Sequence, residues 1–170
     1  MSKDKFQESL ACAQVYESES EINKLLVSLD SSDKIVYTYG VWDLLHPGHI
    51  NLLYRASKLG NFLIVGVVAD KPVSDLKGPD RPTQTQSDRI ITVGTLRFVD
   101  AAIKQPEYDP SPQLKALHRV DILTKGDDWE LIPGTKTIEE LGGELIKVSY
   151  TEGFSTSALV SKMNKDYNEI

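Results

Sequence analysis

The segment that decides the fold reads KIVYTYGVWDLLHPGHINLLYRASKLGNFLIVGVV and spans residues 34–68. It opens with a β-rich run at residues 34–39, and residues 48–59 then carry apolar side chains at helical spacing. Residues 62–68 form a nearly continuous apolar run, which is typical of a strand buried on both faces of a parallel sheet. A strand, a helix and a second strand in this order predict a parallel βαβ unit.

The same alternation continues toward the C-terminus. A polar loop at residues 70–84 comes first, and we expect helices near residues 86–96, 113–118 and 137–141. Strands are predicted near residues 101–103, 121–124 and 144–148, and a last helix begins at Ser155 or Thr156. The predicted fold is therefore α/β, a Rossmann-like parallel sheet of about five strands flanked by helices.

Residues 1–33 read as an N-terminal helical extension, and residues 34–170 as the main domain. Ser18 and Glu21 have the spacing of a capping box. An apolar stripe at helical spacing follows at residues 22, 25, 26 and 29. We expect this extension to pack on the main domain or on a second subunit.

The composition narrows the functional classes. The net charge is −6 and the pI about 5.1, which argues against a protein that coats nucleic acid. The single cysteine, Cys12, excludes an internal disulfide and suits a reducing compartment. No apolar run approaches the roughly 20 residues of a membrane span, and residues 1–10 lack the apolar stretch of a signal peptide. The expected location is the cytoplasm, away from the membrane.

Unusual polar residues follow the predicted strands, at the edge where parallel sheets bind ligands. Two of the three histidines, His46 and His49, flank Pro47-Gly48 after the first strand. Lys77 and Arg81 lie in the loop after the second strand, either as ligand-binding or as solvated charges. KGDDW at residues 125–129 follows the fourth strand, and TEGFSTS at residues 151–157 follows the fifth and opens the last helix.

This set of residues suits transfer between phosphates. The sequence has no P-loop and no Gly-x-Gly-x-x-Gly motif, and no nucleophile elbow or Cys-His pair. Helix N-termini favour phosphate, and an attacking phosphate oxygen needs no base because it is already anionic. Alignment and charge stabilisation then suffice. A transition-metal site at Asp43, His46 and His49 is the alternative.

The motifs resemble those of the cytidylyltransferase family. YGVWDLLHPGHI at residues 39–50 looks like its His-x-Gly-His signature, and TEGFST at residues 151–156 resembles its second signature. LRFVD (96–100) and GDDWE (126–130) look like glycerol-3-phosphate cytidylyltransferases, whereas LKGPDRP (76–82) looks more like the nucleotidyltransferase domain of ADP-heptose synthases. The resemblance covers roughly residues 34–163 and makes residues 34–170 a nucleotidylyltransferase domain.

The resemblance implies roles for individual residues. His46 and His49 would contact the NTP phosphates and stabilise the transition state, and Lys77 would bind phosphate. Asp43 would orient the signature loop or the ribose, and Arg89 and Arg97 would assist or support the phosphate site. The remaining implied nucleotide-site residues are Gly40, Val41, Trp42, Gly48, Gly126, Asp127, Trp129, Thr151, Phe154, Ser155 and Thr156.

The implied reaction moves CMP from CTP to a small phosphorylated or phosphonate acceptor such as glycerol 3-phosphate, with release of pyrophosphate. Mg²⁺ would bridge the triphosphate without a dedicated protein site, and a homodimer is expected. Val41 stands where the family often has Thr, and Tyr150 where many glycerol-3-phosphate enzymes have Arg. Three alternatives follow: an adenylyltransferase that uses ATP and a sugar phosphate, an inactive nucleotide-binding module, and a metal-dependent hydrolase.

Overall fold

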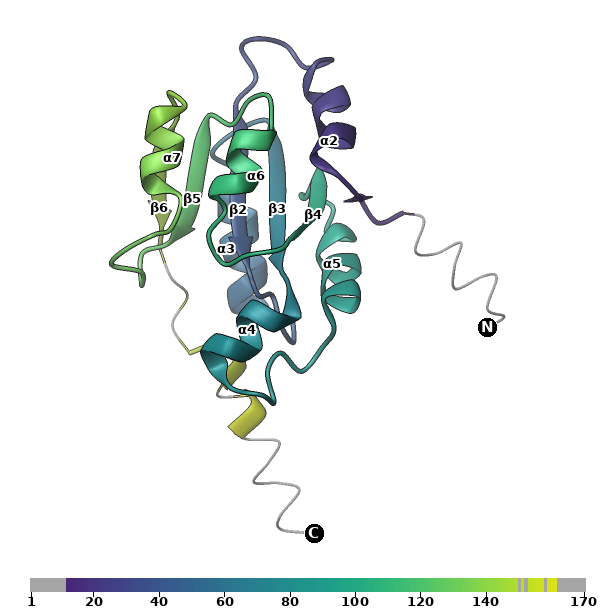
Figure 1. Ribbon diagram of the computed structural model, residues 1–170, viewed down its shortest axis with the longest axis vertical. Coiled ribbons are helices and arrows are strands. Elements are labelled where there is room, and N and C mark those ends of the chain that lie inside the picture. Colours follow the sequence, from purple (N-terminus) through teal and green to yellow (C-terminus); the bar gives the residue numbers. More distant parts are fainter. Residues whose placement is uncertain (1–11, 150, 152, 158, 162–170) are drawn as a thin grey trace.

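A parallel six-stranded sheet forms the centre of the protein (Figure 1). The computed structural model describes residues 12–149, 151, 153–157 and 159–161. The strand order is β1-β4-β3-β2-β5-β6, and every neighbouring pair is parallel. The strands are β1 (Val15–Tyr16), β2 (Ile35–Gly40), β3 (Phe62–Val68), β4 (Ala101–Gln105), β5 (Ile122–Gly126) and β6 (Glu144–Val148). The predicted α/β class is confirmed, with the short β1 added to the five predicted strands.

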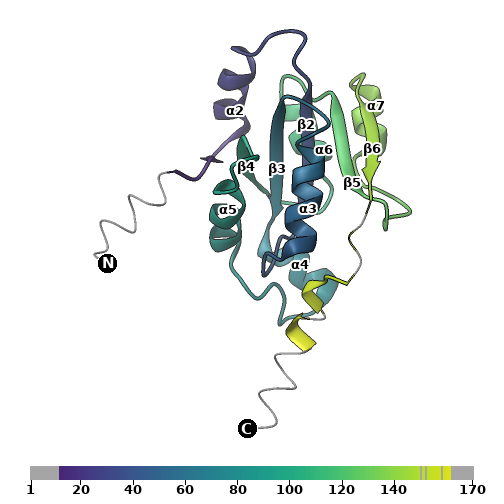
Figure 2. The ribbon, with the colours of Figure 1, turned by 180° about the vertical axis from the view of Figure 1, so that it is seen from behind.

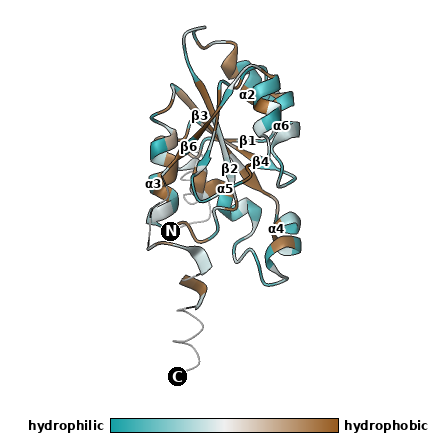
Figure 3. Cartoon of the chain, turned by 90° about the vertical axis from the view of Figure 1, so that its left-hand side faces the viewer, coloured by the Kyte–Doolittle hydropathy of each residue, from teal (hydrophilic) through white to brown (hydrophobic). Residues whose placement is uncertain are grey.

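Helices cover both faces of this sheet, as the two opposite views show (Figures 1 and 2). Helices α2 (Glu19–Leu26), α4 (Asp70–Lys77), α6 (Ser111–Ala116) and α7 (Thr135–Glu140) contribute to the core on one face. Helices α3 (Pro47–Ala56) and α5 (Gln86–Gly94) pack on the other. Alternate residues of β2 explain the division, because Ile35, Tyr37 and Tyr39 face the first core and Val36 the second. Seen edge-on, apolar strands lie between these helical layers (Figure 3).

The order of the strands reverses at β2. From β2 the chain continues to β3 and β4 on one side, and then crosses to β5 and β6 on the other side. Such a switch point opens a crevice beyond the carboxyl ends of the two strands that flank it, here β2 and β5. The topology alone therefore places a ligand site near Gly40 and Gly126, the last residues of these strands.

The N-terminal segment is only partly helical, which corrects the prediction of helix throughout residues 1–33. Its residues 1–11 lie outside the described part of the chain. Val15 and Tyr16 pair with β4 and cover the edge of the sheet, as suits two good strand formers. Ser18 caps α2 by accepting from the backbone N–H of Glu21 at 3.4 Å, while the Glu21 carboxylate accepts from the N–H of Glu17 at 2.9 Å. The domain boundary after residue 33 remains a prediction.

The predicted polar loop at residues 70–84 is the main difference along the rest of the chain, because its first half is helix α4. Pro72 lies in the first turn of α4, where a missing N–H costs nothing, and Val73 is fully buried. The other predicted elements are present, with shifted ends. Among the described residues, no helix is both long and apolar enough to cross a membrane.

Arg89 ties together the segments below the crevice. Its side chain is completely buried. The guanidinium donates to the carbonyl oxygens of Gln84 (3.0 Å), Val68 (2.8 Å) and Val41, and pairs with the Asp70 carboxylate at 2.6 Å. One guanidinium thus provides hydrogen-bond donors for three carbonyl oxygens on separate segments. Arg89 supports the ends of β2, β3 and α5 from below.

Candidate active site

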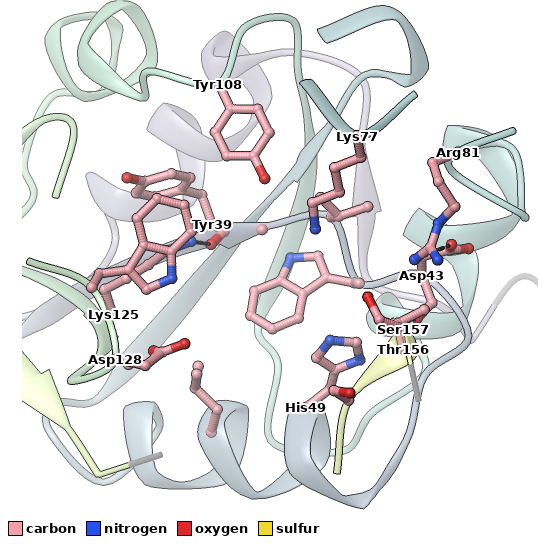
Figure 4. Close-up of a pocket in the computed structure, with 17 residues that line it drawn as sticks. Tyr39, Asp43, His49, Lys77, Arg81, Tyr108, Lys125, Asp128, Thr156 and Ser157 are labelled. Atoms are coloured by element: carbon pink, nitrogen blue, oxygen red, sulfur yellow. Dashed lines mark hydrogen bonds and ion pairs between the residues drawn. The ribbon is translucent and has the colours of Figure 1, made fainter. Parts of the chain in front are cut away.

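A polar pocket lies at the switch point, beyond the carboxyl ends of β2 and β5 (Figure 4). Cationic and hydroxyl side chains gather at one end, where Figure 4 shows Lys77, Arg81, Thr156, Ser157 and His49. Aromatic side chains accompany Lys125 and Asp128 at the other end. The residues that line the pocket are Tyr39, Gly40, Val41, Trp42, Asp43, His49, Leu52, Lys77, Arg81, Tyr108, Lys125, Gly126, Asp128, Trp129, Ser155, Thr156 and Ser157.

The two histidines of the signature motif differ in position. His46 is the N-cap of α3, where its Nδ1 accepts from the backbone N–H of His49 at 3.4 Å. The two imidazole rings stack at 3.8 Å between centroids, and the His49 ring also meets Trp42 edge-to-face at 5.4 Å. His49 lines the pocket, whereas His46 is buried behind it. The structure therefore presents one imidazole to a ligand and supports it with the other.

Burial keeps both imidazoles neutral. It lowers the pKa of His46, and it lowers the pKa of His49 to about 3, with the nearby His46 and Lys77 acting in the same direction. Since Nδ1 of His46 accepts a hydrogen bond, the neutral ring carries its proton on Nε2. Nε2 of His46 and Nδ1 of His49 are buried and lack a partner among the described residues. Neutral imidazoles act by donating hydrogen bonds to a ligand, not by a full charge.

Lys77 and Arg81 bring positive charge to the same end. Lys77 ends α4, and Arg81 belongs to residues 78–85, which we call the Arg81 loop. Loss of hydration and the neighbouring Arg81 lower the pKa of Lys77, while Asp43 opposes this shift. Arg81 Nη2 lies 3.4 Å from Asp43 Oδ2, and Arg81 Nε is buried without a hydrogen-bond partner among the described residues. This end of the pocket is built to receive an anion.

Lys125 is a buried cation at the opposite end. Its Nζ donates to the carbonyl oxygen of Tyr39 at 2.5 Å, and lies 3.9 Å from the Tyr39 ring centroid and 4.9 Å from that of Trp129. Burial lowers the pKa of Lys125 to about 7; Asp128 opposes this shift and Lys77 adds to it. Cation–π contacts stabilise a desolvated ammonium only in part. An anionic ligand in the pocket would therefore favour the charged form.

Gly126 allows the Asp128 side chain to approach the backbone where β5 enters the pocket. A Cβ at this position would lie 2.4 Å from Oδ1 of Asp128, so the Asp128 carboxylate leans across the glycine backbone. The Trp129 ring lies 6.4 Å from that of Tyr108, tilted by 32°. A carboxylate, an ammonium and two ring faces can accommodate a flat or hydroxyl-rich organic group.

The start of the last helix lines the same end of the pocket as Lys77 and Arg81. Residues 156, 157 and 159–161 are helical, which agrees with the predicted helix start. Ser155, Thr156 and Ser157 line the pocket, and Thr156 Oγ1 donates to the carbonyl oxygen of Asp43 at 3.0 Å. A Cβ on Gly48 would lie 3.0 Å from Cβ of Phe154, so α3 and this segment approach closely. The two signature motifs thus meet in one cleft.

The structure does not bring all predicted residues to the pocket surface. Arg97 is exposed beyond α5, where it lines a separate depression with Cys12 and Asp100. Arg89 is buried and supports the strand ends from below. Asp127 is exposed, and its backbone N–H donates to the carbonyl oxygen of Val148 at 2.9 Å. Of the predicted set, His46, Gly48, Arg89, Arg97, Asp127, Thr151 and Phe154 do not line the pocket. Thr151 instead accepts from Asn51 Nδ2 at 2.6 Å, and Tyr150 lies outside the described residues.

Sequence reasoning assigned no site role to several pocket residues: Tyr39, Leu52, Tyr108, Lys125, Asp128 and Ser157. Arg81 was left between a ligand-binding and a solvated role, and the structure places it in the pocket. The available signal for Lys125 was its place in KGDDW, directly after the predicted strand at residues 121–124. Tyr108 gave no such signal, because it lies in a proline-rich loop that only the fold brings close.

The described part of the chain holds no group of three or more His, Cys, Asp or Glu side chains placed to bind a metal ion. Asp43 in particular uses both carboxylate oxygens in hydrogen bonds to the backbone N–H groups of Thr83 and Gln84. The alternative metal site at Asp43, His46 and His49 therefore has no support in this geometry.

Known proteins share this sequence and fold. A family model described as cytidylyltransferase-like matches residues 37–170. The bifunctional protein HldE of Gluconobacter oxydans is 39% identical over 132 residues, which is 76% of this chain and 27% of that protein. HldE of Helicobacter pylori strain P12 is 38% identical over 152 residues, which is 87% of this chain and 31% of that protein. The chain thus spans less than a third of the length of these relatives.

Two solved structures extend the comparison. A lipopolysaccharide core biosynthesis protein from Thermoplasma volcanium superposes with a TM-score of 0.61 at 28% identity, over 71% of this chain and 100% of that one. A pantoate-β-alanine ligase from Francisella tularensis shares the fold, with a TM-score of 0.57 at 14% identity. The superposition covers 82% of this chain and 68% of that one. With a family model that covers most of its length, the chain belongs to the cytidylyltransferase-like family of nucleotidyltransferases.

Proposed function

We propose that this pocket transfers a nucleoside monophosphate from an NTP to a phosphorylated acceptor and releases pyrophosphate. One observation carries the proposal: His49, Lys77, Arg81 and the start of the last helix converge on one end of a cleft whose other end is aromatic. The first end suits a triphosphate, because cations and neutral donors surround it. The second end suits a base or a sugar, because ring faces and polar groups line it.

The chemistry follows from this arrangement. An oxygen of the acceptor phosphate attacks the α-phosphorus of the NTP, and the bond from that phosphorus to the oxygen of the leaving pyrophosphate breaks. The attacking oxygen needs no general base because it is already ionised. The protein contributes alignment and stabilises charge that accumulates on the α-phosphate and the pyrophosphate. His49 acts as a neutral donor in this scheme, with Lys77 and Arg81 as the charged partners.

For the substrates, we favour ATP and a sugar phosphate over CTP and glycerol 3-phosphate. The HldE relatives and the lipopolysaccharide core biosynthesis protein support a sugar-containing product. The resemblance of residues 76–82 to ADP-heptose synthases supports ATP. CTP remains the second candidate, because residues 126–130 resemble those of glycerol-3-phosphate cytidylyltransferases.

Mg²⁺ enters this proposal only with the nucleotide. The donor set does not fit a protein-bound cage, since Asp43 is saturated and no acidic cluster occurs among the described residues. Phosphate oxygens suit Mg²⁺, which keeps several waters in nucleotide sites. The homodimer expected from the family resemblance also remains a prediction, which the sedimentation of the purified chain would decide.

Substrate choice is tested by pyrophosphate release. The purified chain is incubated with Mg²⁺, one of ATP, CTP, GTP or UTP, and a panel of sugar 1-phosphates and glycerol 3-phosphate. We expect the highest rate with ATP and a sugar phosphate. Turnover with CTP and glycerol 3-phosphate alone would establish the second candidate. If nucleotide raises the melting temperature but no acceptor yields pyrophosphate, the chain is an inactive binding module.

The histidines are tested with asparagine. In His49→Asn, kcat should fall by about 100- to 1,000-fold, because one transition-state donor is lost. His46→Asn keeps an N-cap side chain but removes Nε2 and the stacked ring, so activity should fall while the melting temperature changes little. His118→Asn is the matched control, since His118 is exposed and outside the pocket. Wild-type kcat in His49→Asn would contradict the assigned role.

The pH dependence of nucleotide binding tests Lys125. Its pKa is lowered to about 7, so the ammonium is charged below pH 7 and loses its charge as the pH rises. A bound anion favours the charged form, and affinity should therefore weaken between pH 6 and 9, about tenfold for each unit by which the ligand raises the pKa. Lys125→Met keeps the apolar stem without the charge. The nucleotide titrates in the same way with both proteins, so subtracting the pH profile of the variant from that of the wild type leaves the contribution of Lys125. A flat difference between the two profiles would exclude this role.

A further inference from the structure

We infer that Asp43 is a positioning residue that joins the signature loop, the Arg81 loop and the last helix into one phosphate-binding unit. The signature loop comprises residues 40–46, between β2 and α3. The inference rests on the proposed function, and assigns Asp43 to neither a ribose nor a metal.

Both oxygens of the Asp43 carboxylate already accept hydrogen bonds inside the protein. Oδ2 accepts from the N–H of Thr83 at 2.9 Å and Oδ1 from the N–H of Gln84 at 3.0 Å. Arg81 Nη2 approaches Oδ2 at 3.4 Å. With only 1% of its surface exposed, Asp43 offers little to a ligand. Two amide dipoles and a guanidinium instead stabilise its charge, which offsets the free-energy cost of burying a carboxylate.

The backbone of the signature loop directs this side chain inward. Trp42 and Leu44, on either side of Asp43, both adopt left-handed conformations with φ of 55° and 48°. Such angles are uncommon for large side chains and persist only where surrounding contacts fix them. Trp42 Nε1 donates to the carbonyl oxygen of Gly66 at 3.0 Å, and the Leu44 N–H donates to Gln84 Oε1 at 2.9 Å. The loop is therefore fixed on both sides of Asp43.

The contacts of Asp43 with the Arg81 loop, which we call the Asp43 joint, hold that loop in its place at the pocket. Thr83, Gln84 and Arg81 all contact Asp43, and Lys77 lies four residues before Arg81 at the end of α4. Without the carboxylate, two adjacent backbone N–H groups would lose their acceptor and Arg81 its counter-charge. Arg81 would then no longer be aimed at the anion end of the pocket.

A third element joins at the same residue. Thr156 Oγ1 donates to the backbone carbonyl of Asp43 at 3.0 Å, so the first turn of the last helix rests on the signature loop. Because this bond uses the hydroxyl hydrogen of Thr156, other hydrogen-bond donors of the turn would contact a phosphate there. Asp43 thus couples the signature loop, Arg81 and the last helix, which are far apart in the sequence.

Asp43→Asn tests the joint, because one of its two oxygens becomes an NH₂ group that cannot accept from a backbone N–H. We expect the NTP Kd to rise about tenfold, as for loss of hydrogen bonds to a charged group. In an Arg81→Met background the same change should raise Kd less than about threefold, since the cation that Asp43 places is already absent. Asp75→Asn, which removes an exposed carboxylate paired with Lys71, is the matched control and should leave Kd unchanged.

The outcomes separate a positioning role from the others. A full tenfold effect in both backgrounds would mean that Asp43 contacts the nucleotide itself, and a lower melting temperature with unchanged Kd would mean a purely structural role; either result overturns the inference. If Asp43→Asn does not fold, Gln84→Ala removes only the bond to Leu44 and should raise Kd about fivefold. An unchanged Kd in a folded Gln84→Ala would then overturn it.

Amide hydrogen exchange in the nucleotide-free protein tests the joint independently of the proposed function. The amides of Thr83 and Gln84 should be protected in the wild type and exchange at least tenfold faster in Asp43→Asn. If that variant does not fold, the Leu44 amide should exchange at least tenfold faster in Gln84→Ala, which removes its acceptor. Unchanged exchange would overturn the joint even if the enzyme is active. Failure of every NTP to bind the wild type would reject the proposed function and leave the exchange result to decide the joint.

Discussion

The reversal of strand order at β2 is the constraint on which the rest of the site depends. Because the chain leaves β2 toward β3 and later returns to pair β5 on the other side, a crevice opens beyond the carboxyl ends of these two strands. Gly40 ends one strand and Gly126 the other. A Cβ on Gly40 would approach the Trp42 ring to 2.9 Å, and one on Gly126 would displace the Asp128 carboxylate. A larger residue at Gly40 would therefore clash with the buried Trp42 ring, whereas one at Gly126 would move Asp128 within the pocket.

The electrostatics of the pocket differ from those of the whole chain. The protein carries a net charge of −6, yet Lys77, Arg81 and Lys125 line one cleft. Burial, with a further contribution from the neighbouring cations, lowers the pKa of both lysines, so gathering these charges without a bound anion is electrostatically unfavourable. A polyanionic ligand relieves this cost, and part of its binding free energy comes from that relief. Neutral histidines add hydrogen-bond donors without adding further repulsion.

The sequence predicted the sheet well because periodicity reports burial directly. Residues 144–148 form β6 as predicted, and the buried run at 62–68 is β3. The two-residue strand β1 is too short to show periodicity, and its strand conformation depends on pairing with the edge of β4. Polar side chains over residues 70–77 concealed α4, whose single buried side chain is Val73.

The site could be predicted only where residues lie close in sequence. His46, His49 and the last helix start follow from motifs, but their separation into a lining and a supporting histidine follows from packing. Arg89 and Arg97 look equivalent in sequence, yet one is completely buried and the other exposed. That difference arises from three carbonyl groups on separate segments, which no local pattern encodes.

A crystal structure with a non-hydrolysable ATP analogue and Mg²⁺ tests the central claim most directly, because it shows where the triphosphate lies. The account predicts phosphate oxygens within about 3 Å of the His49 imidazole, the Arg81 guanidinium and a donor of the turn at residues 155–157. A triphosphate bound away from these groups, or held only at the aromatic end near Tyr108 and Trp129, would contradict it.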